Sequence, residues 1–397
     1  MRVVVAPDKF KGSMAAAGVA AAVAAGLRAV RGDAEIVTLP VADGGDGTVD
    51  AAVAAGFERI PVTAAGPVGD QVRASYARRG EVAVAEMACV CGLALLPASR
   101  RAPLTASSFG AGEVLRAALE AGARQVVLGV GGSASTDGGA GLLQALGARV
   151  LDGRGDPLGR EVGDRRLAGG ADLGQVATLD LSGLDPRLHP AGRGAPGAAE
   201  LTLAADVDNP LTGPDGAAAV YGPQKGASPA DVAQLEAGMR RWADVVAAAV
   251  GQDRSRAPGA GAAGGVGFAA LAVLGARMRP GIELVLELTG FASRLAGADL
   301  VITGEGSLDA QSLAGKAPVG VARAAARLGV PVVAVAGRST LTAAELAAAG
   351  IAAVYPLTDL EPDPARSHAE ATGLLRQAGQ MIARDWLAGW RPGHERQ

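Results

Sequence analysis

Short apolar runs alternate with alanine-rich windows of helical length along much of this 397-residue chain. Near the start, Arg2–Ala6 reads as a strand, Met14–Val30 as a helix and Ala34–Pro40 as a second strand. Strand–helix–strand units of this length are typical of parallel sheets covered by helices. The pattern therefore predicts an α/β fold, and the chain is long enough for two or three domains with substantial cores.

The alternation changes between Arg59 and about Ala88, where short runs are broken by turn signals such as Gly66-Pro67. This change predicts antiparallel hairpins, and hence a different module. A second strand–helix series follows and ends in a segment rich in Arg, Pro, Gly and Ala at 254–265, which reads as a linker. Beyond it, Ile282–Leu288 is expected to be the first of four further strands.

Composition and charge exclude several classes of protein. The formal net charge is −3, and no run of basic residues supplies the positive field that nucleic-acid binding requires. The most apolar stretch, Ala15–Leu27, is too short to span a bilayer, and Met1–Asp8 reads as a strand rather than as a secretory signal. We therefore expect a cytoplasmic protein that contacts neither nucleic acid nor membrane. The sequence leaves open whether copies of it form a homo-oligomer.

Cysteine and histidine offer little for catalysis or metal binding. The two cysteines, Cys89 and Cys91, are too close in sequence for an ordinary disulfide, and no third ligand is near them. The three histidines lie in connections or in the tail. A zinc site or a Ser-His-Asp triad is therefore not expected.

Lysine is rare in this chain, and its positions mark candidate ligand-binding loops. Each lysine lies in a glycine-rich segment that also carries an acid or an amide, whereas the other basic residues are arginine. A genome that prefers GC-rich codons encodes arginine more often than lysine. A lysine that is retained in such a chain therefore suggests a site that needs a compact ammonium group. We expect these loops to hold anionic oxygen ligands, with phosphate as the first candidate; a chance placement near glycines is the alternative. The lysines are Lys9, Lys11, Lys225 and Lys316.

Two of these segments follow predicted strands, where open α/β sheets bind ligands. In Asp8–Ser13, a lysine could neutralise a carboxylate or phosphate and Ser13 could cap the next helix; a solvated turn is the alternative. In Gly304–Lys316, backbone N–H groups, acids and a lysine lie near a helix N-terminus, which can cradle an anion. The second segment is not a Walker A loop, because that motif is absent from the sequence.

Two other segments place paired acids after predicted strands. Asp43 and Asp46, on a glycine-rich turn, suit Mg²⁺, which takes hard oxygen ligands. Asp206 and Asp208 share one face of an extended chain and indicate a metal ligand or a general base. Helix capping by Asp46 and a turn at Asn209-Pro210 are the structural alternatives.

The segment Gly129–Gly141 follows a strand and opens a helix. Its first glycines fit the dinucleotide-binding pattern, with Asp152 about 20 residues further on. Its serine and threonine hydroxyls suit a small polyhydroxy or phosphorylated ligand better, and Asp137 at the helix start would repel a pyrophosphate. A tight strand–helix turn is a third interpretation.

In their order along the chain, these segments resemble those of the glycerate kinase family, typified by bacterial glycerate 2-kinases. The resemblance covers nearly the whole chain. Each motif alone is weak evidence for the family, but together and in this order they are specific to it. The segments that carry it are Ala6–Ser13, Ala42–Thr48, Gly131–Gly139, Asp206–Leu211, Tyr221–Gly226 and Thr303–Asp309.

The resemblance implies ATP-dependent, Mg²⁺-dependent phosphorylation of D-glycerate, and the family's name favours the O2 hydroxyl. It also implies two α/β domains with the active site in the cleft between them. A Rossmann-like domain with a parallel sheet would be formed by both chain ends, at 1–70 plus 265–397. The inserted α/β domain, at 71–264, would contain some antiparallel strands.

Candidate site residues follow from these segments by role. Asp206 is the first candidate to accept the hydroxyl proton, and Lys9, Lys11 and Asp8 are the other catalytic candidates. The candidate Mg²⁺ ligands are Asp43, Asp46 and Asp208. The residues expected to bind substrate or phosphate are Ser13, Gly131, Gly132, Ser133, Thr136, Asp137, Asn209, Gly304, Glu305, Gly306, Asp309 and Lys316.

Two rival functions stay open at this point. An NAD-dependent oxidoreductase of a small hydroxy acid would use Gly129–Ala134 and Asp152. A non-enzymatic binding protein for hydroxy acids would use the same cleft without chemistry. The scattered paired acids favour a metal–phosphate enzyme over either.

Overall fold

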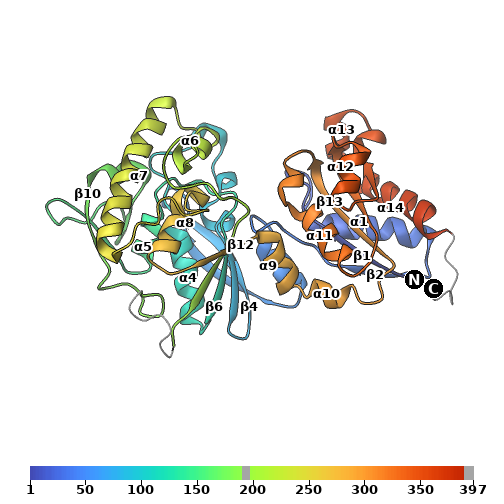
Figure 1. Ribbon diagram of the computed structural model, residues 1–397, viewed down its shortest axis with the longest axis horizontal. Helices are drawn as coiled ribbons and strands as arrows, with labels where there is room; N and C mark the ends of the chain where they lie inside the picture. Colours follow the sequence, from blue (N-terminus) through green and yellow to red (C-terminus); the bar gives the residue numbers. More distant parts are fainter. Residues whose placement is uncertain (190–196, 389–397) are drawn as a thin grey trace. The chain divides into compact units, whose positions relative to one another are not determined.

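The computed structural model describes residues 1–189 and 197–388, which form two compact units (Figure 1). The first unit comprises Met1–Asp43, Asp50–Ala55 and the described residues from Ile282 onward. The second comprises Gly44–Val49 and Gly56–Gly281. Each unit is a sheet covered by helices, so the predicted α/β class with two α/β bodies is confirmed.

The first unit is built on a five-stranded sheet in which every neighbouring pair is parallel, in the order β15-β14-β13-β1-β2. Because β1 pairs with β13, strands from both ends of the chain share one sheet, as expected of the Rossmann-like domain. Its strands are β1 (Arg2–Pro7), β2 (Glu35–Thr38), β13 (Leu300–Leu308), β14 (Val332–Ser339) and β15 (Ala353–Pro356).

Helices cover both faces of this sheet. Val3 and Val5 of β1 pack with α1 (Ala16–Val30) and α14 (Ala371–Leu387), whereas Val4 and Ala6 pack on the opposite face with other helices. A strand buried on both faces is apolar at successive positions, which explains the continuous run that marks β1 in the sequence. The other helical segments from Ile282 onward are α9 (Gly281–Leu288), α10 (Phe291–Arg294), η6 (Ser312–Ala314), α11 (Ala317–Ala326), α12 (Ala343–Ala348), η7 (Leu357–Asp359) and α13 (Pro364–Ala369).

The second unit is built on a six-stranded mixed sheet in the order β12-β11-β6-β5-β4-β3. The strands β5, β6, β11 and β12 are parallel, and β3, β4 and β5 are antiparallel. The hairpins expected between residues 59 and 88 are therefore confirmed. The strands are β3 (Glu58–Ala65), β4 (Gln71–Arg79), β5 (Val82–Glu86), β6 (Gln125–Gly129), β11 (Glu200–Ala204) and β12 (Arg277–Arg279).

Helices and two small antiparallel sheets complete the second unit. The two-stranded sheets pair β7 (Arg149–Asp152) with β10 (Val176–Asp180), and β8 (Arg160–Val162) with β9 (Arg165–Leu167). Among residues 1–189 and 197–388, no helix combines the length and the hydropathy that crossing a bilayer requires. The helical segments are α2 (Thr48–Ala54, which continues into the first unit), α3 (Ala88–Cys91), η1 (Leu93–Leu95), η2 (Ala98–Arg100), α4 (Phe109–Glu120), α5 (Ala140–Ala145), η3 (Gly170–Gln175), α6 (Ala217–Tyr221), η5 (Pro223–Lys225), α7 (Pro229–Val250) and α8 (Ala262–Ala272).

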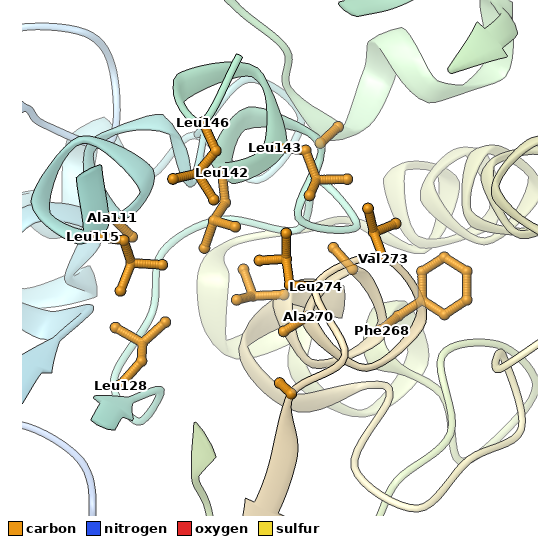
Figure 2. Packing of buried hydrophobic residues seen from close by; sticks show 14 of the residues in the cluster. Ala111, Leu115, Leu128, Leu142, Leu143, Leu146, Phe268, Ala270, Val273 and Leu274 are labelled. Atoms are coloured by element: carbon orange, nitrogen blue, oxygen red, sulfur yellow. The ribbon is translucent and has the colours of Figure 1, made fainter. Parts of the chain in front are cut away.

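The core of the second unit is made almost entirely of aliphatic side chains. Figure 2 shows Leu142 and Leu143 of α5 close to Val273 and Leu274 at the end of α8. Trp242 of α7 is fully buried, and its Nε1–H donates to the carbonyl of Gly138 over 2.9 Å. This bond ties the longest helix of the unit to the loop that precedes α5.

The prediction that Ile282–Leu288 is a strand was wrong, because this segment is helix α9. Ile282, Val285 and Leu286 are buried at helical spacing, whereas Glu283 and Glu287 lie one turn apart on the exposed face. A short apolar run has similar composition in a buried strand and in a helix, so the sequence did not separate them.

The segment 254–265 does not behave as a linker. Ala260 and Ala262 are buried, and a Cβ atom added to Gly264 would lie 2.1 Å from the carbonyl oxygen of Ser135. The glycines therefore serve close backbone packing inside the second unit, not a connection between domains. The unit boundaries differ accordingly from the predicted ones, and a boundary at residue 70 would also separate β3 from β4, which pair along their whole length.

Helices α1 and α14 of the first unit pack with their backbones almost in contact. A Cβ atom added to Gly26 would lie 2.1 Å from the carbonyl oxygen of Arg376, and one added to Gly379 would lie 2.4 Å from that of Val23. We expect Gly26→Ala to lower the free energy of unfolding by about 2 kcal/mol or more, since overpacking outweighs the gain in helix propensity.

The matched control is Gly373→Ala in α14, where an added Cβ meets no atom within 4 Å. It should raise stability by up to about 1 kcal/mol through helix propensity alone. Calorimetric melting of both variants measures the difference, and equal melting temperatures would contradict the close helix contact.

Candidate active site

The strand order of the first unit reverses between β1 and β13. From β1 the chain adds β2 on one side, and β13, β14 and β15 follow on the other. In open α/β sheets, ligands bind beyond the carboxyl ends of the strands at such a reversal. Asp8 follows β1 directly, and its backbone N–H donates to the carbonyl of Gly304 in β13, beside Glu305. Two predicted site residues therefore lie at the preferred position for a ligand.

Three carboxyl groups influence one another at this point: Asp8, Asp43 and Glu305. Burial raises the pKa of the Asp8 carboxyl to about 7; the Lys9 ammonium opposes this shift, while Asp43 and Glu305 add to it. Burial also raises the pKa of Glu305, and its Oε1 accepts no hydrogen bond from the described part of the chain. Carboxyl groups that repel one another in a partly dry environment are stabilised by a bound cation.

Lysine side chains border this acidic group. The Nζ of Lys316, at the N-terminus of α11, lies 3.9 Å from Oε2 of Glu305. Lys9 is half-buried beside Asp8, and Lys11 is exposed. The first unit therefore places positive and negative side chains together at the carboxyl ends of its central strands.

The glycine-rich segment after β13 has an internal structure of its own. A Cβ atom on Gly304 would lie 2.3 Å from the carbonyl oxygen of Val335, so glycine at this position is required by the spacing of β13 and β14. Oδ1 of Asp309 accepts the N–H of Gln311, and the N–H of Asp309 donates to Oγ of Ser312. Asp309 therefore shapes the turn before η6, and the N–H of Lys11 lies beside Gly306.

Ser13 does not cap the helix that follows it. Helix α1 begins at Ala16 with Ala15 in the cap position and no side-chain cap bond, whereas Oγ of Ser13 donates to the carbonyl of His368. The capping interpretation was therefore wrong, because a turn formed by Phe10 and Met14 separates Ser13 from the helix.

In the second unit, the carboxyl ends of four parallel strands meet at one edge, and the segment Gly44–Thr48 lies against it. A Cβ atom on Gly131 would lie 2.7 Å from Cα of Gly45, and one on Gly44 would lie 3.0 Å from the carbonyl oxygen of Ala204. The glycines thus allow the loops after β6 and β11 to approach this segment closely.

The acids of the second unit lie on these loops. Oδ1 of Asp206 accepts the N–H of Gly281 over 2.8 Å, while Asp46 and Asp208 are exposed. Asn209 is held in its own loop, because its amide donates to the carbonyl of Asp215 and its Oδ1 accepts the hydroxyl of Tyr221. Asp206 therefore has a fixed carboxylate at the strand edge, and Asn209 serves mainly to order the chain after it.

The glycine-rich loop after β6 divides into an outer and an inner part. Gly131 and Gly132 are accessible, and Ser133 is 7% exposed. Thr136 and Asp137 are fully buried. The outer residues can reach a ligand, whereas the expected contact of Thr136 and Asp137 with substrate does not fit their burial.

Asp137 instead holds the loop in place. Its Oδ2 accepts the N–H and the hydroxyl of Ser108, each over 2.7 Å, and the N–H of Gly141 over 3.2 Å. Its Oδ1 accepts the N–H of Gly139 over 3.1 Å. Burial raises the pKa of Asp137, and these hydrogen bonds oppose that shift. The carboxylate joins the start of α4 to the start of α5.

Lys225 lies beside this loop; the sequence placed it in a candidate ligand-binding segment, Tyr221–Gly226, but gave it no role in the site. It is 2% exposed, and its Nζ donates to Oγ of Ser133 over 3.1 Å and to the carbonyl of Ser135 over 2.5 Å. Burial lowers the pKa of its ammonium group to about 8. The rarity of lysine marked this residue in the sequence, but its contact with the loop after β6 is visible only in the structure.

The carboxyl groups at the carboxyl ends of β1 and β13 suit a cation that also takes ligands from phosphate groups and water. In residues 1–189 and 197–388, no three His, Cys, Asp or Glu residues are grouped so that they could hold a metal ion by themselves. Mg²⁺ in phosphate-binding sites needs only one or two carboxylates and keeps several waters. The orphaned Oε1 of Glu305 and the neighbouring carboxyls of Asp8 and Asp43 fit such an ion.

A dinucleotide-binding site requires its acid at the end of a parallel strand next to the glycine-rich loop, and Asp152 does not lie there. Asp152 ends β7, which pairs with β10 in a separate two-stranded sheet and not with β6. Its Oδ1 accepts the N–H groups of Arg154 and Asp156 in an exposed turn. The acid expected to bind a ribose therefore does not lie on a parallel strand next to the glycine-rich loop.

Comparisons with known proteins agree with the motif resemblance. The sequence model of the family described as "Glycerate kinase family" matches residues 3–387. The chain is 42% identical over 384 residues to a glycerate kinase of Halalkalibacterium halodurans, which covers 96% of this chain and 97% of that protein. It is 43% identical over 359 residues to the glycerate 2-kinase of Escherichia coli K12, and the alignment covers 89% of this chain and 90% of that protein.

A solved structure is similar along the whole chain. It is the crystal structure of a Salmonella typhimurium LT2 protein assigned provisionally as glycerate kinase 2. The TM-score is 0.81 at 40% identity, and the match covers 98% of this chain and 99% of that one.

We expect Asp137→Ala to lower the free energy of unfolding by at least about 3 kcal/mol, because it leaves four buried donors without their acceptor. Urea unfolding measures this change. The matched control is Asp152→Ala, which removes a partly exposed acid whose hydrogen bonds lie in an exposed turn, and which should lower the free energy of unfolding far less. Equal losses in the two variants would contradict the role given to Asp137.

Proposed function

Because the chain belongs to the glycerate kinase family, we propose that it transfers the γ-phosphoryl group of ATP to a hydroxyl of D-glycerate. The products would be ADP and 2-phosphoglycerate, with O2 as the acceptor in line with the glycerate 2-kinase among its relatives. The observation that carries the proposal is the group of acids and lysines at the strand reversal of the first unit. Phosphoryl transfer depends on positioning and charge neutralisation more than on covalent chemistry.

Lysines of the first unit supply the positive charge. Lys316 lies beside Glu305, and Lys9 lies beside Asp8. Both are compact ammonium groups at the carboxyl ends of central strands, where an anionic ligand is expected. We assign Lys9, Lys11 and Lys316 to the γ-phosphate and to the glycerate carboxylate, whose negative charges must be offset during transfer.

The acids of the site fit a magnesium ion. Asp43 is the first ligand we propose, because its carboxyl is coupled electrostatically to Asp8 and Glu305. Asp46 and Asp208, which are exposed on loops of the second unit, are the other proposed ligands. When bound, the ion would neutralise charge on phosphate oxygens and orient them.

Asp206 is the residue we propose to accept the proton of the attacking hydroxyl. Its Oδ1 accepts the N–H of Gly281, which orients the carboxylate just beyond the carboxyl end of β11. Asp8 is the second candidate, since a carboxyl whose pKa is raised to about 7 is tuned near neutral pH.

The loop after β6 would hold an anionic part of the substrate. Gly131, Gly132 and Ser133 can supply N–H groups and a hydroxyl as donors from its outer part. Asp137 and Thr136 would contribute indirectly, by keeping this loop in its conformation. A cytoplasmic location accords with the use of ATP.

The first experiment measures ADP release with a panel of hydroxy acids. We expect release only with D-glycerate, complete loss of release on addition of EDTA, and recovery with excess Mg²⁺. Nuclear magnetic resonance of the product should place the phosphoryl group on the oxygen bonded to the secondary carbon. Glycerate binding without ADP release would support the non-enzymatic alternative, and turnover that requires NAD would support the oxidoreductase.

Substitution of Asp43 tests the assignment of the metal ligands. Asp43→Asn should raise the Mg²⁺ concentration needed for half-maximal activity by about tenfold or more, because a hard cation loses a charged ligand. The control is Asp33→Asn, which removes an exposed acid from the same unit. An unchanged Mg²⁺ requirement in Asp43→Asn would exclude this residue as a ligand.

Substitution of Asp206 tests the proton acceptor. Asp206→Asn keeps an oxygen for the N–H of Gly281 but removes the base, so kcat should fall by roughly 100-fold or more while folding is kept. The control is Asp215→Asn, an exposed acid of the neighbouring loop, which should retain kcat. A normal kcat in Asp206→Asn together with a loss in Asp8→Asn would move the role to Asp8.

A further inference from the structure

A buried lysine joins two segments that are far apart in the sequence. Lys225 lies at the end of η5, and its Nζ reaches Ser133 and Ser135 in the loop after β6. Burying an ammonium group costs free energy unless its hydrogen bonds and charge are satisfied. The position of this lysine therefore needs an explanation beyond packing.

The backbone of the loop is already fixed without Lys225. The N–H of Ala134 donates to the carbonyl of Cys91 over 2.7 Å, and the N–H of Leu93 donates to the carbonyl of Gly132 over 2.8 Å. Asp137 holds the inner end through four donors. Lys225 adds one more bond to the backbone, at the carbonyl of Ser135, and a contact with a side chain of the loop, the hydroxyl of Ser133.

The contact with Lys225 determines the direction in which the Ser133 hydroxyl can donate its hydrogen. Because Oγ of Ser133 accepts a hydrogen bond from the ammonium group, its own hydrogen must point away from Nζ. A hydroxyl polarised by a positive charge is a stronger donor. Ser133 is 7% exposed, so this hydrogen can be offered to an oxygen atom of a ligand.

Charge balance accounts for the choice of lysine. The charge of Asp137 acts on Lys225 and opposes the lowering of its pKa by burial. Lysine also fits this position better than arginine would, since a compact ammonium group can donate to a hydroxyl and a carbonyl at a sharp angle. A chain that uses arginine for nearly all its other positive charges retains lysine here.

We propose that Lys225 is a positioning residue that orients and polarises the Ser133 hydroxyl toward an anionic oxygen of the substrate. The inference rests on the proposed function, and it adds a residue outside the set assigned to the reaction. Lys225 itself does not touch substrate. Its effect on catalysis passes through Ser133.

A double-mutant cycle with Lys225→Met and Ser133→Ala tests this dependence. Each single variant should lower kcat/KM for glycerate by about 10- to 100-fold, as expected for a charge-assisted hydrogen bond, while KM for ATP changes little. The double variant should be no worse than the poorer single variant. Losses that multiply in the double variant would overturn the proposal, because they would mean that the two residues act independently.

Folding is checked by circular dichroism and thermal melting. If Lys225→Met does not fold, the cycle is repeated with Lys225→Gln, which keeps N–H donors for the carbonyl of Ser135. An unchanged kcat/KM in Ser133→Ala overturns the proposal whatever the lysine variants do. Wild-type protein that releases no ADP with glycerate would instead contradict the proposed function.

Discussion

Parallel strand pairing is the constraint on which the rest of this structure depends. Parallel strands run in one direction, so the loops that follow them gather at a single edge of the sheet. In the first unit, pairing of β1 with β13 brings Asp8 and Glu305 together from opposite ends of the chain. In the second, β6 and β11 bring the glycine-rich loop and Asp206 to the same edge. Antiparallel pairing of these strands would have sent their following loops to opposite edges.

The buried carboxyl groups of this protein differ in how far hydrogen bonds satisfy them. Asp137 is fully buried, but four donors satisfy it, so its charge is used to build the loop. Asp8 and Glu305 are nearly as buried, yet they repel each other, and Glu305 retains an oxygen without a hydrogen bond in the described chain. An incompletely satisfied group is the one that gains from a ligand. The balance of donors and charges, and not burial itself, therefore separates the residue that builds the loop from the residues that we propose to act on a ligand.

Much of the fold could be predicted because buried parallel strands and alanine-rich helices leave clear local patterns. The helix predicted over Met14–Val30 is observed as α1, which begins at Ala16 and ends at Val30. Segment α9 and the tightly packed stretch 254–265 could not be identified, because composition does not reveal what packs against a run of residues. The same limit applies to the site: the motifs identified the loops, but the inward direction of Asp137 and the contact of Lys225 with Ser133 depend on tertiary structure.

The glycine-rich loop shows why a shared motif does not by itself assign a role to each of its residues. Gly131 is required because the chain passes beside Gly45, and Gly139 adopts a positive φ of 75° at the start of α5. Such residues are fixed by architecture, as is Asp137. Ser133 lies at the outer end of the same motif and has a hydroxyl to offer. A relative could therefore keep every architectural residue of this loop and still differ in chemistry, if it lost Ser133 or the lysine that orients it.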